Sequence, residues 1–260
     1  MLRTRLGTAL VALPATLAIV LFAPASVFTG FIAALVAWGL YEIAAMTKAR
    51  AIETLVVAIA GGVPAILLLA GAGGTPLVPA IVTLGMLALV ARVAINGAQS
   101  VSRGVWFVIL GALWVGTLFP YFALLRNHPG GIPIIILMLL LVVASDSGAY
   151  FTGRALGRLK LIPQVSPNKT VEGAIGGLAV CVIAAITLRP LLASAWSVGA
   201  TVTMSAAVGV LAQLGDLAGS AFKRVAGVKD SGWIFPGHGG LLDRTCSLVF
   251  AAAFTYYYSR

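Results

Sequence analysis

The side chains that could do chemistry gather in one polar stretch, residues 223–247, which lies between two apolar runs. The stretch reads KRVAGVKDSGWIFPGHGGLLDRTCS and contains two Lys, two Arg, two Asp and one His. Only 9% of the whole chain is charged, so this is a strong local concentration. A solvated connection between helices needs no such ordered set of cations, acids and glycines. The stretch therefore predicts a functional site.

Acidic residues are scarce, and an acid inside an apolar run is a candidate for function because charge in a membrane is costly. The chain has seven: Glu42, Glu53, Asp146, Glu172, Asp216, Asp230 and Asp243. Four of them are expected at one depth near one membrane surface: Asp146, Glu172, Asp216 and Asp243. Such a cluster suits Mg²⁺, which binds carboxylate oxygens together with substrate phosphates. Ordinary ion pairs with loop Lys and Arg are the alternative interpretation.

Helical spacing places a cation beside one of these acids. Ser220 lies one turn after Asp216 and Lys223 lies two turns after it, so the three side chains project from one helix face. A metal ligand and a phosphate-binding ammonium would then point into the same space.

Two glycines before Asp243 predict an anion-binding helix start. Gly239 and Gly240 precede the last apolar run, and free backbone amides and the helix dipole at such a start attract a phosphate. Together with Lys223 and Asp216, this start would bring a metal ligand, a cation and amide donors within reach of one polyphosphate.

Other polar residues have structural interpretations. For Glu42 and Glu53 we expect ion pairs with Lys or Arg at the membrane surface. For His238, which lies beside two glycines, a structural or phosphate contact is favoured over proton transfer. His128 lies in a short predicted outer loop with Arg126 and Pro129, remote from the acids, and is given no function.

A second polar segment covers residues 146–173 and is rich in Gly, hydroxyl groups and cations. Ser166-Pro-Asn-Lys-Thr, ahead of an apolar run, supplies a hydroxyl cap, a turn and the donor Lys169. These features suit a triphosphate site and a well-formed helix start equally well. The segment does not match the G-x-x-x-x-G-K-[ST] loop of P-loop nucleotide-binding proteins.

The elements that must position these residues are membrane-spanning helices. The 260-residue chain is 60% hydrophobic, and its mean hydropathy is +1.07. These values predict a polytopic membrane protein, and apolar runs without alternation predict helices rather than barrel strands. The expected fold is an all-α bundle with nine spans: 6–23, 26–46, 53–71, 76–96, 105–125, 131–151, 171–188, 198–218 and 241–258.

Two regions follow from this assignment. Residues 1–130 form about five spans, and residues 131–260 form the remaining spans and carry the polar segments. An alternative for the first span is a cleaved secretory signal, because Arg3 and Arg5 precede an apolar stretch that ends in Phe-Ala-Pro-Ala-Ser.

Loop charge predicts the orientation, because short cytoplasmic loops are enriched in Lys and Arg. On the nine-span assignment, 14 of the 17 basic residues fall on one side. Only Arg126, Arg189 and Arg260 fall on the other. We therefore expect a cytoplasmic N-terminus, an outer C-terminus and a cytoplasmic site.

The net charge of +10 does not predict nucleic-acid binding. The basic residues are thinly spread and form no dense block with interleaved aromatic residues. The two cysteines, Cys181 and Cys246, have neither a disulfide framework nor a metal-binding spacing.

The residues from 220 to 246 resemble the phosphatidate cytidylyltransferases, also called CDP-diacylglycerol synthases. The family pattern is S-x-aliphatic/aromatic-K-R-x4-K-D-x-small-x2-apolar-P-x-H-G-G-apolar-x-D-R-x-D. Here it reads Ser220-Ala-Phe-Lys-Arg224, four residues, then Lys229-Asp230-Ser-Gly-Trp-Ile-Phe-Pro-Gly-His238-Gly-Gly-Leu-Leu-Asp243-Arg244-Thr-Cys246. Asp146-Ser-Gly-Ala-Tyr-Phe and Ser166-Pro-Asn-Lys-Thr-Val-Glu-Gly resemble companion motifs. The resemblance is specific over about 140–250, and the N-terminal half resembles the family only as a series of spans.

The resemblance implies transfer of a cytidylyl group from CTP to phosphatidic acid, which gives CDP-diacylglycerol and pyrophosphate for phospholipid biosynthesis. It implies Mg²⁺ in a two-metal site with Asp216 and Asp243 as ligands. The catalytic residues would be Asp216, Asp243, Lys169 and Asp146. The substrate-binding residues would be Ser166, Glu172, Ser220, Lys223, Arg224, Lys229, Asp230, His238, Gly239, Gly240 and Arg244. The protein would lie in a bacterial inner membrane.

Cys246 departs from the pattern, which has Asp at its last position. It follows Asp243 by about one turn on the same helix face, where a second carboxylate could join a two-metal site. A thiol is a soft ligand and a poor partner for Mg²⁺. We therefore expect reduced activity, unless another group supplies the oxygen or the site needs no ligand there.

Two other functions remain as alternatives. An ion-coupled transporter would carry charges near mid-span and some repeat symmetry, whereas here the acids gather in the C-terminal half. A CTP-dependent enzyme acting on another lipid phosphate would have the same motifs. A homodimer is a further expectation to test, because the Gly-rich third and seventh spans could pack within one chain or between two.

Overall fold

The computed structural model describes residues 14–71, 75–235 and 239–260, and most of them are helical. Residues 14–22 form a helix. The further elements are α2 (Ala25–Thr47), α3 (Ala51–Leu69), α4 (Leu77–Asn96), η1 (Ala98–Ser100), α5 (Val105–Leu118), α6 (Pro120–Asn127), α7 (Gly131–Leu156), β1 (Lys160–Ile162), β2 (Ser166–Thr170), α8 (Val171–Leu192), α9 (Val198–Ala226) and α10 (Leu242–Tyr258).

Within the described residues, seven helices are long and apolar enough to cross a membrane. They are α2, α3, α4, α5 with α6, α7, α8 and α9. The fold is therefore that of a polytopic helical membrane protein, as the sequence predicts. The other two predicted spans are not among the seven. α10 has 17 residues, and the predicted span 6–23 lies partly outside the described residues.

Helices α7 and α9 continue past the ends of the predicted spans. α7 extends to Leu156, so Asp146 lies ten residues before its end. α9 extends to Ala226, ten residues beyond Asp216, and stops where Gly227 adopts a left-handed conformation. The polar residues that ended the predicted spans do not stop either helix, and each helix ends at a glycine, Gly157 after α7 and Gly227 after α9.

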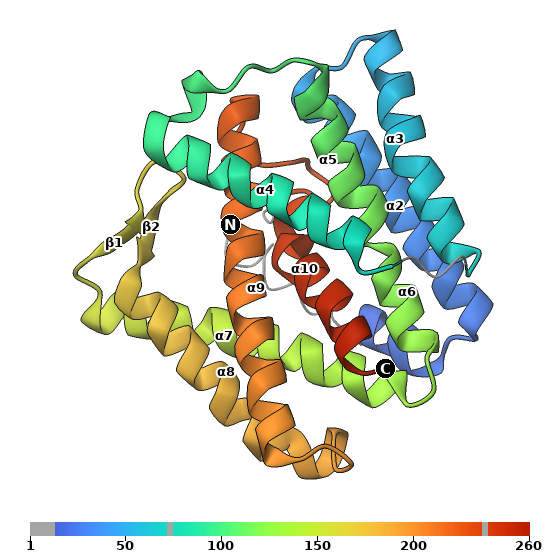
Figure 1. The fold of residues 1–260 in the computed structure, drawn as a ribbon, viewed down its shortest axis with the longest axis vertical. Helices are drawn as coiled ribbons and strands as arrows, with labels where there is room; N and C mark the ends of the chain where they lie inside the picture. The colour runs from blue at the N-terminus through green and yellow to red at the C-terminus, as the bar shows by residue number, and fades with distance from the viewer. Residues whose placement is uncertain (1–13, 72–74, 236–238) are drawn as a thin grey trace.

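The segment between α7 and α8 is a short antiparallel hairpin of β1 and β2 (Figure 1). Ser166 to Thr170 form strand β2, so the predicted turn at this motif is wrong. The predicted hydroxyl cap is confirmed, because Thr170 Oγ1 accepts the amide of Gly173 at the start of α8. The hairpin places Lys169 near α9.

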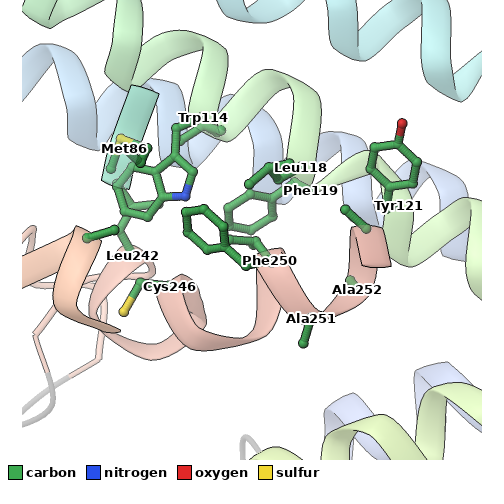
Figure 2. Close-up of a cluster of buried hydrophobic side chains, with 14 of the residues drawn as sticks. Met86, Trp114, Leu118, Phe119, Tyr121, Leu242, Cys246, Phe250, Ala251 and Ala252 are labelled. Atoms are coloured by element: carbon green, nitrogen blue, oxygen red, sulfur yellow. The ribbon is translucent and has the colours of Figure 1, made fainter. Parts of the chain in front are cut away.

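The buried core includes residues from nearly all the helices, and its aromatic centre lies where α5, α9 and α10 pack together. Figure 1 shows where these helices lie in the fold. Phe107 stacks on Phe222 with 4.1 Å between ring centroids, and Trp114 lies between Phe222 and Phe250. Figure 2 shows Trp114 and Phe250 in the apolar cluster where α5 meets α10. The two halves of the chain therefore share one core.

Gly61 of the third predicted span and Gly177 of the seventh pack within the chain. A Cβ on Gly116 of α5 would lie 2.0 Å from the Gly61 carbonyl oxygen of α3. A Cβ on Gly177 of α8 would lie 2.6 Å from the Ser145 carbonyl oxygen of α7. These contacts lie within the single chain, and the homodimer stays a prediction.

Candidate active site

A polar cavity of about 370 Å³ lies where α7, α9 and the start of α10 meet. Its lining is made almost entirely of polar side chains: Asp146, Asp216, Lys223, Asp230, Asp243, Arg244, Cys246 and Ser247. Three of the four carboxylates that we expected together, those of Asp146, Asp216 and Asp243, are in this lining. Ser247 is a lining residue that the sequence did not indicate.

The hairpin supplies a cation to the Asp216 side of the cavity. Lys169 Nζ lies 2.7 Å from Asp216 Oδ2, and the Asp216 side chain remains 43% exposed. An ammonium on a flexible stem can keep this contact and still donate to a phosphate, since it has three N–H donors. The motif around Lys169 thus contacts a lining residue of the cavity, Asp216, from a separate element.

The Asp243 carboxylate is held by several donors and its side chain is only 6% exposed. Lys223 Nζ pairs with Oδ1. Oδ2 accepts the amides of Ser231 at 2.7 Å and Gly240 at 2.9 Å, and the Ser231 hydroxyl lies 3.0 Å away. Such charge-assisted bonds fix the orientation of a carboxylate.

The amides at the start of α10 are bonded to carboxylates of the chain itself. Gly240 N donates to Asp243, while Leu241 N and Leu242 N donate to Glu42 at 2.7 and 3.0 Å. The prediction that these amides are free to bind a phosphate is therefore wrong for these three residues. The dipole at this helix start is already opposed by two negative side chains.

Glu42 lies in the interior, and the predicted surface ion pair is wrong. Its residue is 2% exposed, and its carboxylate accepts from Trp38 Nε1 and Ser231 Oγ as well as the two amides. Glu53 accepts the Arg50 amide at 2.8 Å and closes a capping box at the start of α3, so its contact is a backbone one. The prediction failed for Glu42 because its partners come from distant parts of the chain.

Cys246 lines the cavity at a place where α9 and α10 approach closely. A Cβ on Gly215 of α9 would lie 2.3 Å from the Cys246 carbonyl oxygen, and one on Gly219 would lie 2.9 Å from Cys246 Cβ. Figure 2 shows the Cys246 sulfur pointing away from Trp114 and the apolar cluster. The sulfur lies 3.7 Å from Asp216 Oδ1.

Some predicted site residues do not line the cavity. Glu172 accepts the Leu159 amide at 3.2 Å, which holds the base of the hairpin to α8. Arg224 Nε lies 3.4 Å from the carbonyl oxygen of Val165 in the hairpin turn. Lys169 is also outside the lining and contacts it through Asp216. The others outside the lining are Ser166, Ser220, Lys229, Gly239 and Gly240, and His238 lies outside the described residues. Their predicted contacts with substrate stay predictions.

The donor chemistry of the cavity fits Mg²⁺. Among the residues that the structure describes, no group of three His, Cys, Asp or Glu side chains is arranged around a common metal position. Mg²⁺ commonly uses only one or two carboxylates and takes its other ligands from substrate phosphates and water. Asp216 and Asp243, with Asp146 and Asp230, offer such oxygens in one cavity, whereas Cys246 offers soft sulfur.

Comparison of the sequence with known proteins finds a matching family model and several bacterial relatives. A family model described as "Cytidylyltransferase family" matches residues 3–260. Phosphatidate cytidylyltransferase of Bacillus subtilis is 41% identical over 154 residues, which are 59% of this chain and 57% of that protein. The same-named protein of Brucella suis is 41% identical over 178 residues, 68% of this chain and 65% of that protein. That of Staphylococcus haemolyticus is 42% identical over 144 residues, 55% of each. The matches cover less than two thirds of each relative.

Proposed function

Because the chain belongs to the cytidylyltransferase family, we propose that it transfers the cytidylyl group of CTP to phosphatidic acid. A phosphate oxygen of the lipid forms a bond to the α-phosphorus of CTP, and the bond to the β-phosphate breaks. Pyrophosphate leaves with the electron pair, and CDP-diacylglycerol is formed. The observation that carries this proposal is the cavity of paired acids and cations at the start of α10.

The main physical difficulty of this reaction is to bring two polyanions together. The cations of the site would reduce the electrostatic repulsion between them. Lys169, Lys223 and Arg244 approach from β2, α9 and α10 and would contact phosphate oxygens. Holding the two substrates in line and neutralising their charge accounts for most catalysis of this type. No covalent intermediate with the protein is needed.

Asp216 and Asp243 are the proposed ligands of Mg²⁺, with two ions as the expected number. Asp216 has the more exposed carboxylate. Asp243 Oδ1 contacts Lys223, and the same oxygen keeps a second lone pair for a cation. The metal would neutralise phosphate charge and polarise the phosphoryl group that is attacked.

The proposed topology has nine spans, a cytoplasmic N-terminus and cavity, and an outer C-terminus, in a bacterial inner membrane. Two contacts between residues at the predicted outer ends of spans are consistent with this topology. Arg126, from a predicted outer loop, donates to the carbonyl oxygen of Val20 near the predicted outer end of the first span. Tyr258 Oη donates to Ala200 O, and both are predicted to lie on the outer side. The bacterial sources of the relatives support the choice of membrane.

The test of the proposed function is the identity of the product. The purified chain would be incubated with CTP, Mg²⁺ and phosphatidic acid, and in parallel with an ether-linked lipid phosphate or a polyprenyl phosphate. We expect a lipid-soluble cytidine product only with a phosphatidic acid substrate. A product formed only from another lipid phosphate would reassign the substrate, and nucleotide-independent ion flux without any such product would favour a transporter.

A further inference from the structure

Glu42 of α2 is a buried carboxylate that the proposed mechanism does not use. It is 2% exposed and lies within a helix that is long enough to span the membrane. Among the residues that the structure describes, its Oε1 accepts from Trp38 Nε1 at 3.0 Å and Leu241 N at 2.7 Å. Its Oε2 accepts from Leu242 N at 3.0 Å and Ser231 Oγ at 2.8 Å. A buried carboxylate is tolerated only when donors replace water in this way.

The backbone around Glu42 leaves no room for other side chains. A Cβ on Gly240 would lie 2.5 and 2.6 Å from the two carboxylate oxygens, and one on Gly232 would lie 2.7 Å from Oε1. Residues 231–232 and 240–242 therefore pack closely around the carboxylate. A shift of this backbone would break several of its hydrogen bonds together.

Ser231 joins Glu42 to the cavity. Its hydroxyl lies 2.8 Å from Glu42 Oε2 and 3.0 Å from Asp243 Oδ2, and its amide donates to the same Asp243 oxygen. The hydroxyl has one proton, so it donates to one carboxylate at a time. The Asp243 amide also donates to Ser231 Oγ at 3.3 Å. Glu42 and Asp243 thus both lie within hydrogen-bond distance of the Ser231 hydroxyl. Of three successive amides at the start of α10, the first donates to Asp243 and the next two donate to Glu42.

We propose that Glu42 is a positioning residue for the cytidylyl-transfer site: it anchors the start of α10 and, through Ser231, sets the orientation of Asp243. Glu42 itself does not line the cavity, so it acts through residues that do. The inference rests on the proposed function. It gives the N-terminal half of the chain an indirect part in the site, because Glu42 of α2 holds residues of the site in place.

The test compares Glu42→Gln, Glu42→Asp and a matched control, Glu53→Gln, which removes a carboxylate that caps α3. Glu42→Gln replaces one acceptor oxygen by an NH₂ group that cannot accept from a backbone amide. We expect its kcat to fall about tenfold to a hundredfold, the usual effect of losing an outer-shell partner. The Mg²⁺ concentration for half-maximal rate should rise, while the KM for CTP changes little. Glu42→Asp, which keeps the charge, should recover part of the loss, and Glu53→Gln should match the parent.

Hydrogen exchange provides a readout that does not depend on turnover. In Glu42→Gln, the amides of residues 239–247 should exchange faster than in the parent, and those of α3 should not change. If the parent shows no lipid-dependent reaction, the proposed function fails, and exchange alone then decides whether Glu42 anchors α10. Parental kcat, Mg²⁺ dependence and exchange in folded Glu42→Gln would overturn the inference.

Ser231→Ala tests the link between the two carboxylates. It should lower kcat in the parent and add little to the loss in Glu42→Gln, because residues of one network are not additive. Full additivity of the two losses would show that Glu42 does not act through Ser231.

Discussion

The thiol of Cys246 lies 3.7 Å from Asp216 Oδ1, on the wall of the cavity that also contains Asp243. This contact joins α9 and α10 at the position where the family pattern has a second Asp on the α10 face. A hard cation in the cavity would meet oxygen on one side and sulfur on the other.

Replacing this thiol should improve the site. Cys246→Asp places a carboxylate next to Asp216, where it can share a Mg²⁺ ion, and we expect turnover to rise at least about tenfold, the lower range for groups that support a metal. Cys246→Asn, of similar size but uncharged, should give no such rise. The measurement is initial rate across a magnesium titration. Equal turnover of the parent and Cys246→Asp at every Mg²⁺ concentration would show that this position needs no ligand.

Asp216 and Asp243 should differ in what their loss does to stability. Asp243→Asn removes the partner of the mostly buried Lys223, and breaking such a pair costs about 3 kcal/mol or more of unfolding free energy. Asp216→Asn breaks a more exposed pair with Lys169 and should cost about 1 kcal/mol or less. Denaturant unfolding in detergent compares them, and both variants should lose turnover. A larger loss of stability in Asp216→Asn would contradict the assigned environments.

Lys169 should contribute to turnover through the specific position of its ammonium on β2, and not only through the net positive charge of the hairpin. Lys169→Ala removes the ammonium beside Asp216, which we propose contacts a phosphate oxygen of the substrate. A charge-assisted hydrogen bond of this kind contributes about 1.5–3 kcal/mol, so its loss should lower kcat/KM for CTP about tenfold to a hundredfold. Lys160→Ala removes an exposed cation from the neighbouring strand as a control. Equal effects of the two changes would mean that the hairpin contributes only electrostatic attraction.

The close approach of α9 and α10 should be sensitive to a single methyl group. Gly215→Ala would place Cβ 2.3 Å from the Cys246 carbonyl oxygen, so α10 must move away. We expect a loss of about 1–3 kcal/mol in unfolding free energy together with lower turnover. Gly62→Ala on α3, where a Cβ meets nothing within 4 Å, should be neutral or slightly stabilising. A stable and fully active Gly215→Ala would show that the helices are less tightly packed than described.

The parts of the site that local spacing determines were predictable from the sequence. Asp216 and Lys223 are seven residues apart on one helix, and Asp243 and Cys246 are three apart on another, so each pair shares a face that meets the cavity. The helical membrane fold was equally predictable, because it follows from hydropathy and from the need to satisfy backbone groups within each span.

The parts that depend on distant contacts were not predictable. Glu42 and Ser231 are 189 residues apart in sequence, and no local pattern relates them. The same contact explains the bonded amides of Leu241 and Leu242, which looked free because helix starts are judged from neighbouring residues alone. The only signal in the sequence was that Glu42 lies inside an apolar run. The prediction of a surface ion pair gave this signal too little weight.

Pyrophosphate release from CTP by the purified chain tests the proposed reaction most directly. It would be measured with phosphatidic acid against detergent alone, and with Mg²⁺ against a chelator, for both the parent and Cys246→Asp. We expect release that requires lipid and metal together, slow in the parent and faster in Cys246→Asp. Absence of lipid-dependent release from both forms would contradict the assignment of the cavity to cytidylyl transfer.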